Sequence, residues 1–477
     1  MKMIIGGQKV NASDGKTMES INPYTRKVID VFPSATAADI NLAVENAVSG
    51  SKEWMHTPLH KRIAILIRFT ELLSAHQEEI TSLLVKEMGK PVLQAKGEVG
   101  VALARAGAFI EGARQLGGTS YPPSSRTVNE GDMIFTIRQP LGVVVAIVPF
   151  NFPVANLLTK VIPALLMGNA VIVKPSSLTS LCGIRVVELL LESGVPGNVL
   201  QIVTGKGGEI GDLLTGDSRI AAVTMTGSTD VGARIASMAM KNICHVMLEL
   251  GGNDPLVVLP DADLDYAVRE AATNRIRNNG QACCGTKRYV VPNAQKEKFI
   301  RMLVSELQKV KLGDPALEET GCGPLVSAAA AREAEEAVRH TVAQGGKVVF
   351  GGARFDETFF EPTVLDVPPE ADVAKSLEIF APVWSVIGYD TTEQALEIAN
   401  NSDYGLNAGV IGNDLKLLFH FAQFMQAGTC VINGSSYYVG FDSPFGGYKK
   451  SGLGRESTVD CLKEMSQEKT IVLKQCF

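Results

Sequence analysis

Short runs of apolar, β-branched residues recur through the middle of the chain, and each is followed by a turn and a stretch of helical periodicity. Such runs are typical of strands buried on both faces, and strands that alternate with helices form parallel sheets. The sequence therefore predicts a parallel sheet covered by helices on both sides. The predicted strands are residues 143–148, 170–173, 199–203 and 220–225.

The first third of the chain has the pattern of amphipathic helices. Thr36 and Asp39 are spaced as a capping box, and apolar residues then recur every three or four positions. A longer helical pattern extends from about residue 59 to residue 88, where Gly89 and Pro91 end it. A further helix is expected through residues 102–114.

The composition is that of an ordinary soluble enzyme. The 477 residues are 45% hydrophobic and 20% charged, which suffices for two or three cores and excludes a disordered or fibrous chain. The net charge of -6 and the lack of basic blocks give no support for nucleic acid or an anionic membrane as a partner. A small-molecule substrate is the better prediction.

The eight cysteines are scattered without C-x-x-C spacing, so we expect reduced thiols rather than disulfides, and we predict no metal site. The start of the chain has no apolar leader with a cleavage site, and no segment offers about 18 uninterrupted apolar residues. These features predict a cytoplasmic location.

Four turns follow the predicted strands, at the edge of the sheet where parallel sheets bind ligands: residues 149–151, 174–177, 204–205 and 226–228. Gly227 and Ser228 precede a predicted helix, whose N-terminus attracts phosphate. Lys174 could reach a ribose hydroxyl or a phosphate. Residues 205–211 mimic a dinucleotide fingerprint, but Ile210 replaces its third glycine, so we interpret them as a tight turn, with phosphate contact as the alternative.

A thiol and a carboxylate each lie in a turn of small residues, Cys283 after Gly280 and Glu249 before Gly251. A thiolate is a strong nucleophile, and a carboxylate at the end of an apolar run can act as a general base with a raised pKa. The pair predicts covalent catalysis followed by attack of activated water.

Taken singly, these residues have simpler structural interpretations. Free cysteines are mostly small core residues, which is the expectation for Cys182, Cys284 and Cys430. Glu249 alone would be a solvated or salt-bridged carboxylate. The argument for chemistry depends on the joint placement of such groups at strand ends.

Six short segments that span nearly the whole chain form a series: Pro149–Pro153, Thr226–Thr229, Glu249–Asn253, Gly280–Cys283, Glu378–Val383 and Pro444–Lys449. In this order they closely resemble the signatures of the NAD(P)-dependent aldehyde dehydrogenase superfamily.

The resemblance implies an α/β fold with a Rossmann-like cofactor domain, a catalytic α/β domain and a small β oligomerisation arm. By analogy, the cofactor domain comprises residues 1–117 and 140–247, the catalytic domain residues 248–455, and the arm residues 118–139 and 456–477. The apolar strand at 469–473 has an edge that needs a partner chain. A homodimer or homotetramer is therefore expected.

The resemblance also implies a mechanism. The Cys283 thiolate attacks an aldehyde to form a thiohemiacetal, and oxidation gives a thioester that water activated by Glu249 hydrolyses to an acid. The Asn151 amide and the Cys283 backbone N–H stabilise the oxyanion. Lys160 and Glu456 match a pair that relays protons to solvent.

The implied cofactor is NADP or NAD. Glu378 matches a residue that hydrogen-bonds the nicotinamide ribose, and Phe380 one that packs on the nicotinamide. Many NAD-preferring members carry a glutamate where this chain has Ser177, so we expect NADP to be accepted and favoured. The expected cofactor contacts are Val148, Pro149, Phe150, Lys174, Ser176, Ser177, Gly207, Gly227, Ser228, Leu250, Gly251, Glu378 and Phe380.

The expected substrate is a small aldehyde in a pocket of aromatic and hydroxyl groups. Arg105, Arg277 or Arg288 could reach an anionic substrate, so semialdehydes remain open. By family position the substrate contacts are Phe152, Asn156, Thr159, Ala282, Cys284, Phe445 and the loop 435–441.

Three rival functions stay open. A CoA-acylating dehydrogenase passes its thioester to CoA, but such members usually lack the acid at Glu249. A thiol hydrolase of the nitrilase kind would leave the nucleotide-binding turns unexplained. A crystallin-like relative without activity would have no need of Cys283, Glu249 and Asn151.

Overall fold

The computed structural model describes residues 1–475, and its first sheet has eight strands in the order β2-β1-β9-β8-β7-β10-β11-β23. The five strands from β9 to β11 are parallel, which confirms the predicted sheet. The eight strands of this sheet are β1 (Met3–Ile5), β2 (Gln8–Val10), β7 (Val143–Ile147), β8 (Ala170–Lys174), β9 (Leu200–Ile202), β10 (Ala222–Thr226), β11 (His245–Glu249) and β23 (Gly452–Leu453).

The strand order reverses direction beside β7. The chain runs outward through β7, β8 and β9 and then returns to the other side of β7 for β10 and β11. The loops that leave the carboxyl ends of β7 and β10 therefore diverge. Open parallel sheets bind ligands in the crevice at such a switch point.

Eight helices cover this sheet: α1 (Ala37–Trp54), α2 (Leu59–Ala75), α3 (Gln77–Met88), α4 (Val92–Gln115), α5 (Pro153–Leu166), α6 (Ser180–Glu192), α7 (Gly207–Thr215) and α8 (Thr229–Ala239). The capping box predicted at Thr36 and Asp39 is present. The single helix expected over residues 59–88 is instead two helices. They meet at His76, which has φ -101° and ψ 15°, and Glu79 accepts a 2.7 Å hydrogen bond from its ring. Apolar spacing continues across this junction, so the periodicity did not reveal it.

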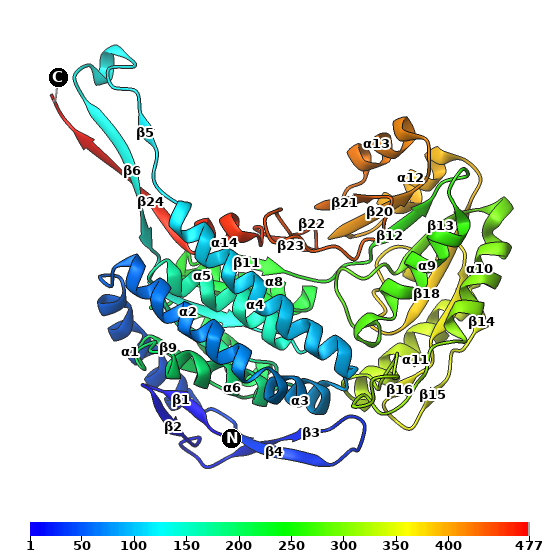
Figure 1. Cartoon of the computed structure of the whole chain (residues 1–477), viewed down its shortest axis with the longest axis horizontal. Helices are drawn as coiled ribbons and strands as arrows, with labels where there is room; N and C mark the ends of the chain where they lie inside the picture. Colours follow the sequence, from blue (N-terminus) through cyan, green and yellow to red (C-terminus); the bar gives the residue numbers. More distant parts are fainter. Residues whose placement is uncertain (476–477) are drawn as a thin grey trace.

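A second sheet of seven strands has the order β14-β17-β18-β13-β12-β20-β21 and is parallel except for β14. Its strands are β12 (Pro255–Val258), β13 (Arg288–Pro292), β14 (Lys347–Phe350), β17 (Thr363–Val367), β18 (Val383–Tyr389), β20 (Asn407–Ile411) and β21 (Thr429–Ile432). Its helices are α9 (Leu264–Arg275), α10 (Asn293–Leu307), α11 (Ala328–Ala343), α12 (Thr392–Asn400) and α13 (Leu415–Phe424). The two sheets form separate lobes (Figure 1).

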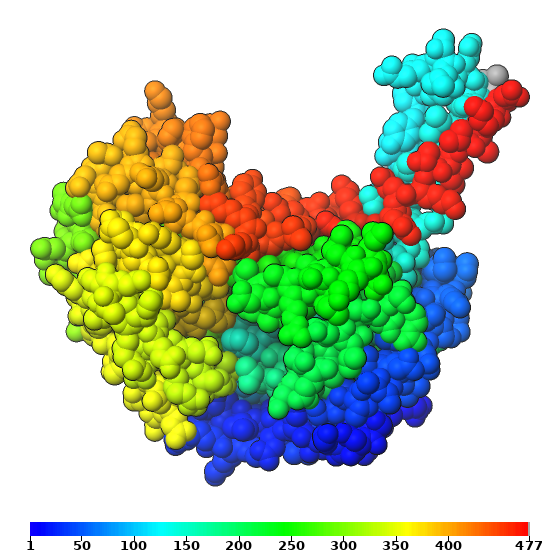
Figure 2. Space-filling view, turned by 180° about the vertical axis from the view of Figure 1, so that it is seen from behind, coloured from blue at the N-terminus to red at the C-terminus, as the bar shows by residue number. Residues whose placement is uncertain are grey.

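The short strands β5 (Ser120–Tyr121), β6 (Met133–Pro140) and β24 (Ser466–Leu473) form a third sheet that projects from the first lobe (Figure 1). Figure 2 shows this arm, in cyan and red, standing clear of the rest. β24 pairs with β6 along its whole length, after helix α14 (Thr458–Glu464).

The remaining strands form two-stranded pairs: β3 (Thr17–Ile21) with β4 (Val28–Pro33), β15 (Arg354–Phe355) with β16 (Phe359–Phe360), and β19 (Tyr404–Gly405) with β22 (Tyr448–Lys449). Within residues 1–475, no helix has the length and apolar content needed to cross a membrane. The domain boundaries stay a prediction, and β23, from the segment assigned to the second domain, pairs with β11 of the first sheet.

Candidate active site

Cys283 follows a strained turn, the 3-10 segment η3 (Arg277–Gly280). Asn278, Asn279 and Gly280 all have positive φ, at 54°, 56° and 76°. A Cβ added to Gly280 would lie 2.2 Å from the carbonyl carbon of Ala381. The turn therefore needs glycine at this position in order to pack against the Ala381 segment.

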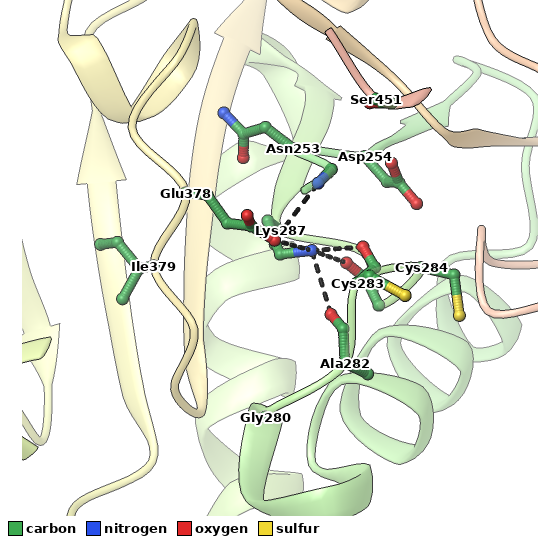
Figure 3. A network of polar contacts seen from close by, with 12 residues as sticks. Asn253, Asp254, Gly280, Ala282, Cys283, Cys284, Lys287, Glu378, Ile379 and Ser451 are labelled. Carbon is green, nitrogen blue, oxygen red and sulfur yellow. Dashed lines mark hydrogen bonds and ion pairs between the residues drawn. The ribbon is translucent and has the colours of Figure 1, made fainter. Parts of the chain in front are cut away.

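Two buried cations hold the backbone around this turn. The Arg275 guanidinium donates hydrogen bonds to the carbonyls of Gly280 and of three residues of the facing segment, Ile379, Ala381 and Val383, at 2.5–3.1 Å. The Lys287 ammonium donates to three carbonyls of the nucleophile turn itself (Figure 3). The sequence analysis missed both residues, because their partners are backbone carbonyls, which no motif reveals.

The Glu249 carboxyl ends β11 and is buried. Its Oε1 has no hydrogen-bond partner within residues 1–475. Burial raises the pKa of Glu249 well above its usual range, and the nearby Cys283 and Glu456 raise this pKa further, while Lys160 lowers it. Glu249 is thus a candidate general base that is neutral until its surroundings change.

The Cys283 thiol is half-buried and electrostatically coupled to Glu249. A hydrogen bond with Cys284 and burial raise the pKa of Cys283 well above its usual range, while Lys287 and Glu249 lower it. The two groups that the sequence predicted to act together therefore influence each other's pKa, and both favour their protonated forms.

Asn151 follows β7, and its side chain has a fixed orientation. Its Oδ1 accepts a 3.1 Å hydrogen bond from the N–H of Phe152. Its backbone carbonyl accepts from Lys90 at 2.8 Å and from the Asn278 amide at 2.9 Å. Within the described chain its amide nitrogen has no hydrogen-bond partner. That nitrogen is thus an unused donor, although Asn151 is buried and does not itself line the cavity that contains Cys283.

A buried ion pair that the sequence analysis missed lies beneath Asn151. Lys90 pairs with Glu98, and both side chains are 1% exposed. Glu98 also accepts hydrogen bonds from the N–H groups of Val154 at 2.9 Å and Ala155 at 3.2 Å, in the first turn of α5. An available signal was the position of Glu98 within the apolar stripe of α4, where a charge needs a buried partner.

Lys160 and Glu456 form a 2.8 Å ion pair. Lys160 is buried on α5, and the side chain of Glu456 is 19% exposed. Because the charges of both residues act on Glu249, the pair leads from that carboxyl toward the surface. This arrangement suits the predicted proton relay, whose operation stays a prediction.

A cavity of about 600 Å³ opens onto Cys283, Glu249 and Glu456. Its wall contains most of the predicted substrate contacts, namely Phe152, Asn156, Thr159, Cys284, Phe445 and residues 437–441. Ala282 does not line it, since that side chain is buried elsewhere in the turn. One wall that the sequence analysis missed comes from α4, with Leu93, Gln94, Gly97, Val101 and Phe109.

Two of the three candidate arginines line this cavity. Arg105 donates a 2.7 Å hydrogen bond to Thr159, and the Arg277 guanidinium lies 5.1 Å from the centre of the Tyr437 ring. Within residues 1–475, neither guanidinium forms an ion pair with a carboxylate. Arg288 does not line the cavity, because its guanidinium is buried against backbone carbonyls, including that of Asn253 at 2.6 Å.

The predicted phosphate-binding turns meet at the carboxyl ends of β8 and β10. Lys174 ends β8, its ammonium donates to the Pro175 carbonyl at 3.1 Å, and burial lowers the pKa of Lys174 to about 8. A Cβ at Gly207, the first residue of α7, would lie 3.9 Å from that ammonium. Ser228 is the N-cap residue of α8 but makes no side-chain cap hydrogen bond, so the N–H groups of that helix end remain open.

Smaller contacts complete this side of the site. The Val148 N–H donates to the Lys174 carbonyl at 3.0 Å, and the Gly227 N–H donates to the Glu249 carbonyl at 3.0 Å. Ser176 and Ser177 are half-buried in the turn after Lys174. Ser176 accepts a hydrogen bond from the next turn, whereas Ser177 has no hydrogen-bond partner within the described residues.

The remaining predicted cofactor residues gather around Glu378. Phe380 packs edge-on against Phe150, which follows Pro149, with ring centres 5.9 Å apart. Glu378 accepts a 3.3 Å hydrogen bond from the N–H of Gly252 and pairs with Lys287 at 3.1 Å. A Cβ at Gly251 would lie 2.5 Å from the Glu378 carboxylate, and the neighbouring Leu250 N–H donates to the Ser451 carbonyl. A side chain at Gly251 would therefore displace the Glu378 carboxylate from its present position.

Comparisons with known proteins agree over nearly the whole chain. Residues 10–471 match the family model described as "Aldehyde dehydrogenase family". The glutarate-semialdehyde dehydrogenase of Pseudomonas putida is 36% identical over 458 residues, 95% of this chain and 94% of the relative. The 3-sulfolactaldehyde dehydrogenase of Priestia aryabhattai is 35% identical over 96% of this chain and 94% of its own. A solved structure titled as an E. coli NADP dependent enzyme has a TM-score of 0.95 and 31% identity, covering 99% of this chain and 98% of its own.

Proposed function

The chain belongs to the aldehyde dehydrogenase family and is an oxidoreductase that oxidises an aldehyde to a carboxylic acid with a nicotinamide dinucleotide, and we propose that its reaction proceeds through a thioester on Cys283. One observation carries this proposal: the Cys283 thiol and the Glu249 carboxyl are electrostatically coupled and line the same cavity. A nucleophile and a base must meet in this way if acylation and hydrolysis occur at one carbon.

In the first step, we propose, the ionised form of Glu249 takes the Cys283 thiol proton as the sulfur attacks the aldehyde carbon. That proton then leaves through the Lys160–Glu456 ion pair, which restores the carboxylate. Two donors serve the oxyanion, the Asn151 amide nitrogen and the Cys283 backbone N–H. The fixed orientation of Asn151 supports its role, because a donor held in advance needs no reorganisation during the reaction.

The chemistry that a bound nicotinamide supplies is acceptance of a hydride from the adduct, which leaves the thioester on Cys283. Glu249 then removes a proton from the attacking water, and the Lys160–Glu456 ion pair passes this proton toward solvent. The raised pKa of Glu249 suits both transfers, because a base with a pKa nearer neutrality can both accept and release a proton.

The residues around Lys174 fit a dinucleotide, since Gly207 has no side chain to fill the space next to the buried ammonium and the N-terminus of α8 has no side-chain cap. We propose NADP as the preferred cofactor. The support is that Ser177, three residues after Lys174, makes no hydrogen bond within the described residues and puts a hydroxyl at a position where a carboxylate would repel a 2′-phosphate. Comparing kcat/KM for the two cofactors tests the proposal, and a strong preference for NAD would refute it.

We further propose a substrate with an anionic tail, such as a semialdehyde. The three acids that line the cavity offer little negative charge to repel such a tail, since Glu98 and Glu456 are ion-paired with lysines and Glu249 favours its protonated form. Arg105 and Arg277 are left as unbalanced cations. Both named relatives take aldehydes that carry an acid group, which supports the same choice.

The substrate proposal is tested with matched aldehydes, 5-oxopentanoate against pentanal. Arg105→Met and Arg277→Met should each lower kcat/KM for the anion about tenfold or more while leaving pentanal little changed, because a charged hydrogen bond contributes about 1.5–3 kcal/mol. Equal losses for both aldehydes would show that the arginines do not read charge.

We propose that the arm forms a homodimer or homotetramer in the cytoplasm. In the described chain β24 pairs with β6 alone, so its other edge can add a strand from a second copy. The seven cysteines of residues 1–475 are all free, which suits a reducing compartment. Light scattering on the wild type and on Thr470→Pro tests the oligomer. Thr470 pairs with Thr136, whose N–H points to the β5 side, so the Thr470 N–H lies on the free edge of β24.

The whole mechanism is tested by product analysis. Wild-type protein should form free acid without CoA, and Cys283→Ser should lose turnover while keeping cofactor affinity. A requirement for CoA would favour the acylating alternative, and undiminished turnover of Cys283→Ser would end the proposal.

A further inference from the structure

The side chain of Lys287 is 3% exposed and lies between the nucleophile turn and the cofactor side of the site. Its ammonium donates hydrogen bonds to the carbonyls of Ala282 at 3.1 Å, Cys283 at 2.6 Å and Gly285 at 3.2 Å. It also pairs with Glu378 at 3.1 Å. Figure 3 shows these contacts converging on one nitrogen atom.

The carbonyl contacts determine the direction of a catalytic donor. A trans peptide unit is planar, so the Cys283 N–H points away from the Ala282 carbonyl. Because Lys287 holds that carbonyl, the N–H points away from the ammonium. In the described chain this N–H donates to no protein group, which leaves it free for an oxyanion.

The contact with Glu378 joins this turn to a second element. Glu378 lies on the segment before β18, about 90 residues further along the chain, and its Oε1 is shared by Lys287 and the Gly252 N–H. Glu378 is the proposed acceptor for the nicotinamide ribose. A single cation thus contacts both the acceptor for the cofactor and the backbone of the nucleophile.

We propose that Lys287 is a positioning residue that ties Glu378 to the nucleophile turn, orients the Cys283 N–H and supplies the positive charge that activates the Cys283 sulfur. The inference rests on the proposed function, because it takes Cys283 as the nucleophile and Glu378 as the ribose acceptor.

The charges around the sulfur make Lys287 the group to test. The titratable side chains that influence Cys283 most are Cys284, Lys287 and Glu249, and Tyr437 also interacts with it. Cys284 raises the pKa of Cys283, whereas Lys287 lowers it by attraction to the thiolate. Lys287 itself faces a second carboxyl, that of Asp254, whose pKa burial raises to about 7.

The experiment measures alkylation of Cys283 by iodoacetamide as a function of pH, followed at the Cys283 peptide by mass spectrometry, without aldehyde or cofactor. Lys287→Met keeps the length of the side chain and removes its charge. The pH midpoint of alkylation should rise by about one unit. The matched control is Lys296→Met on α10, which breaks a 2.8 Å ion pair with Asp366 of β17, and its midpoint should equal that of the wild type.

An unchanged or lower midpoint in folded Lys287→Met overturns the proposal, and a lower melting temperature alone, which a merely structural role would give, does not rescue it. Glu378→Gln provides a second measurement that keeps Lys287. Its midpoint should fall, because the ammonium loses the carboxylate that offsets its charge. If Lys287→Met does not fold, an unchanged or higher midpoint in Glu378→Gln overturns the proposal.

These measurements separate the inference from the proposed function. Alkylation requires no turnover, so a failed shift in Lys287→Met with normal aldehyde oxidation removes only the role of Lys287. Full activity of Cys283→Ser would instead remove the proposed function, whatever the alkylation shows.

Discussion

Replacement of Asn151 by alanine tests the oxyanion donor directly. The side chain makes one hydrogen bond within the described protein, from the Phe152 N–H to Oδ1, while the contacts of Lys90 and Asn278 are to the backbone carbonyl. Asn151→Ala therefore removes the free amide and leaves the backbone supports in place. Loss of one internal hydrogen bond should lower the free energy of unfolding by about 1 kcal/mol.

The catalytic effect should be much larger. Loss of one preorganised oxyanion donor costs about 2.7–4 kcal/mol of transition-state stabilisation. At about 1.36 kcal/mol per tenfold change in rate, kcat should fall roughly 100- to 900-fold. KM should change little, because the donor acts on charge that develops in the transition state.

The assay is initial-rate formation of reduced cofactor, with urea denaturation on the same samples. Asn169→Ala is the matched control, since that buried side chain makes four hydrogen bonds, with Leu141, Gly142, Ala164 and Met465, none of them near Cys283. It should lose more stability than Asn151→Ala and keep a nearly normal kcat. A fall of less than tenfold in the kcat of Asn151→Ala would refute the oxyanion role.

Three further variants test other parts of the site. Glu249→Gln should lose steady-state turnover, because the proposed proton transfers from the thiol and from water both use this carboxylate, and it should release at most about one equivalent of reduced cofactor per site. In the wild type, hydrolysis should quicken with rising pH as this carboxyl, whose pKa burial raises, ionises. Repeated turnover of Glu249→Gln near the wild-type rate would contradict the role. Lys174→Met should raise the KM for NADP at pH 7. In the wild type, this KM should increase when the pH exceeds about 8, because the ammonium then loses its proton. A wild-type KM that does not depend on pH would argue against a phosphate contact. Gly280→Ala should lower the free energy of unfolding by more than about 1–2 kcal/mol, because a left-handed residue is strained and its Cβ would meet Ala381 at 2.2 Å; denaturation midpoints equal to the wild type would disprove the requirement.

The regular part of the fold could be read from local pattern. The four apolar runs became β7, β8, β9 and β10 within a residue or two of their predicted ends, because a short β-branched run between turn residues has few other stable uses. The capping box at Thr36 specified a helix start by itself. The break at His76 could not be predicted, since its cause includes contacts of the Glu79 carboxylate with Arg185, about 100 residues away.

The site divides in the same way. Cys283, Glu249 and Asn151 could be proposed from the sequence because each lies in a short motif, and their roles remain predictions. Lys287 and Arg275 were not found, because what they hold is a set of backbone carbonyls brought together only by folding. A buried lysine or arginine of this kind cannot be distinguished by local sequence from one at the surface.

The ion pair of Lys90 with Glu98 has a consequence for engineering this enzyme. Exchange of either residue alone leaves an isolated charge in the interior, which typically costs about 3–5 kcal/mol, whereas exchange of both for apolar residues can be nearly neutral. Libraries that vary one position at a time will therefore report both sites as immutable. Only libraries that vary Lys90 and Glu98 together can change the shape of the wall under Asn151. Altered specificity at this wall therefore requires coupled substitutions.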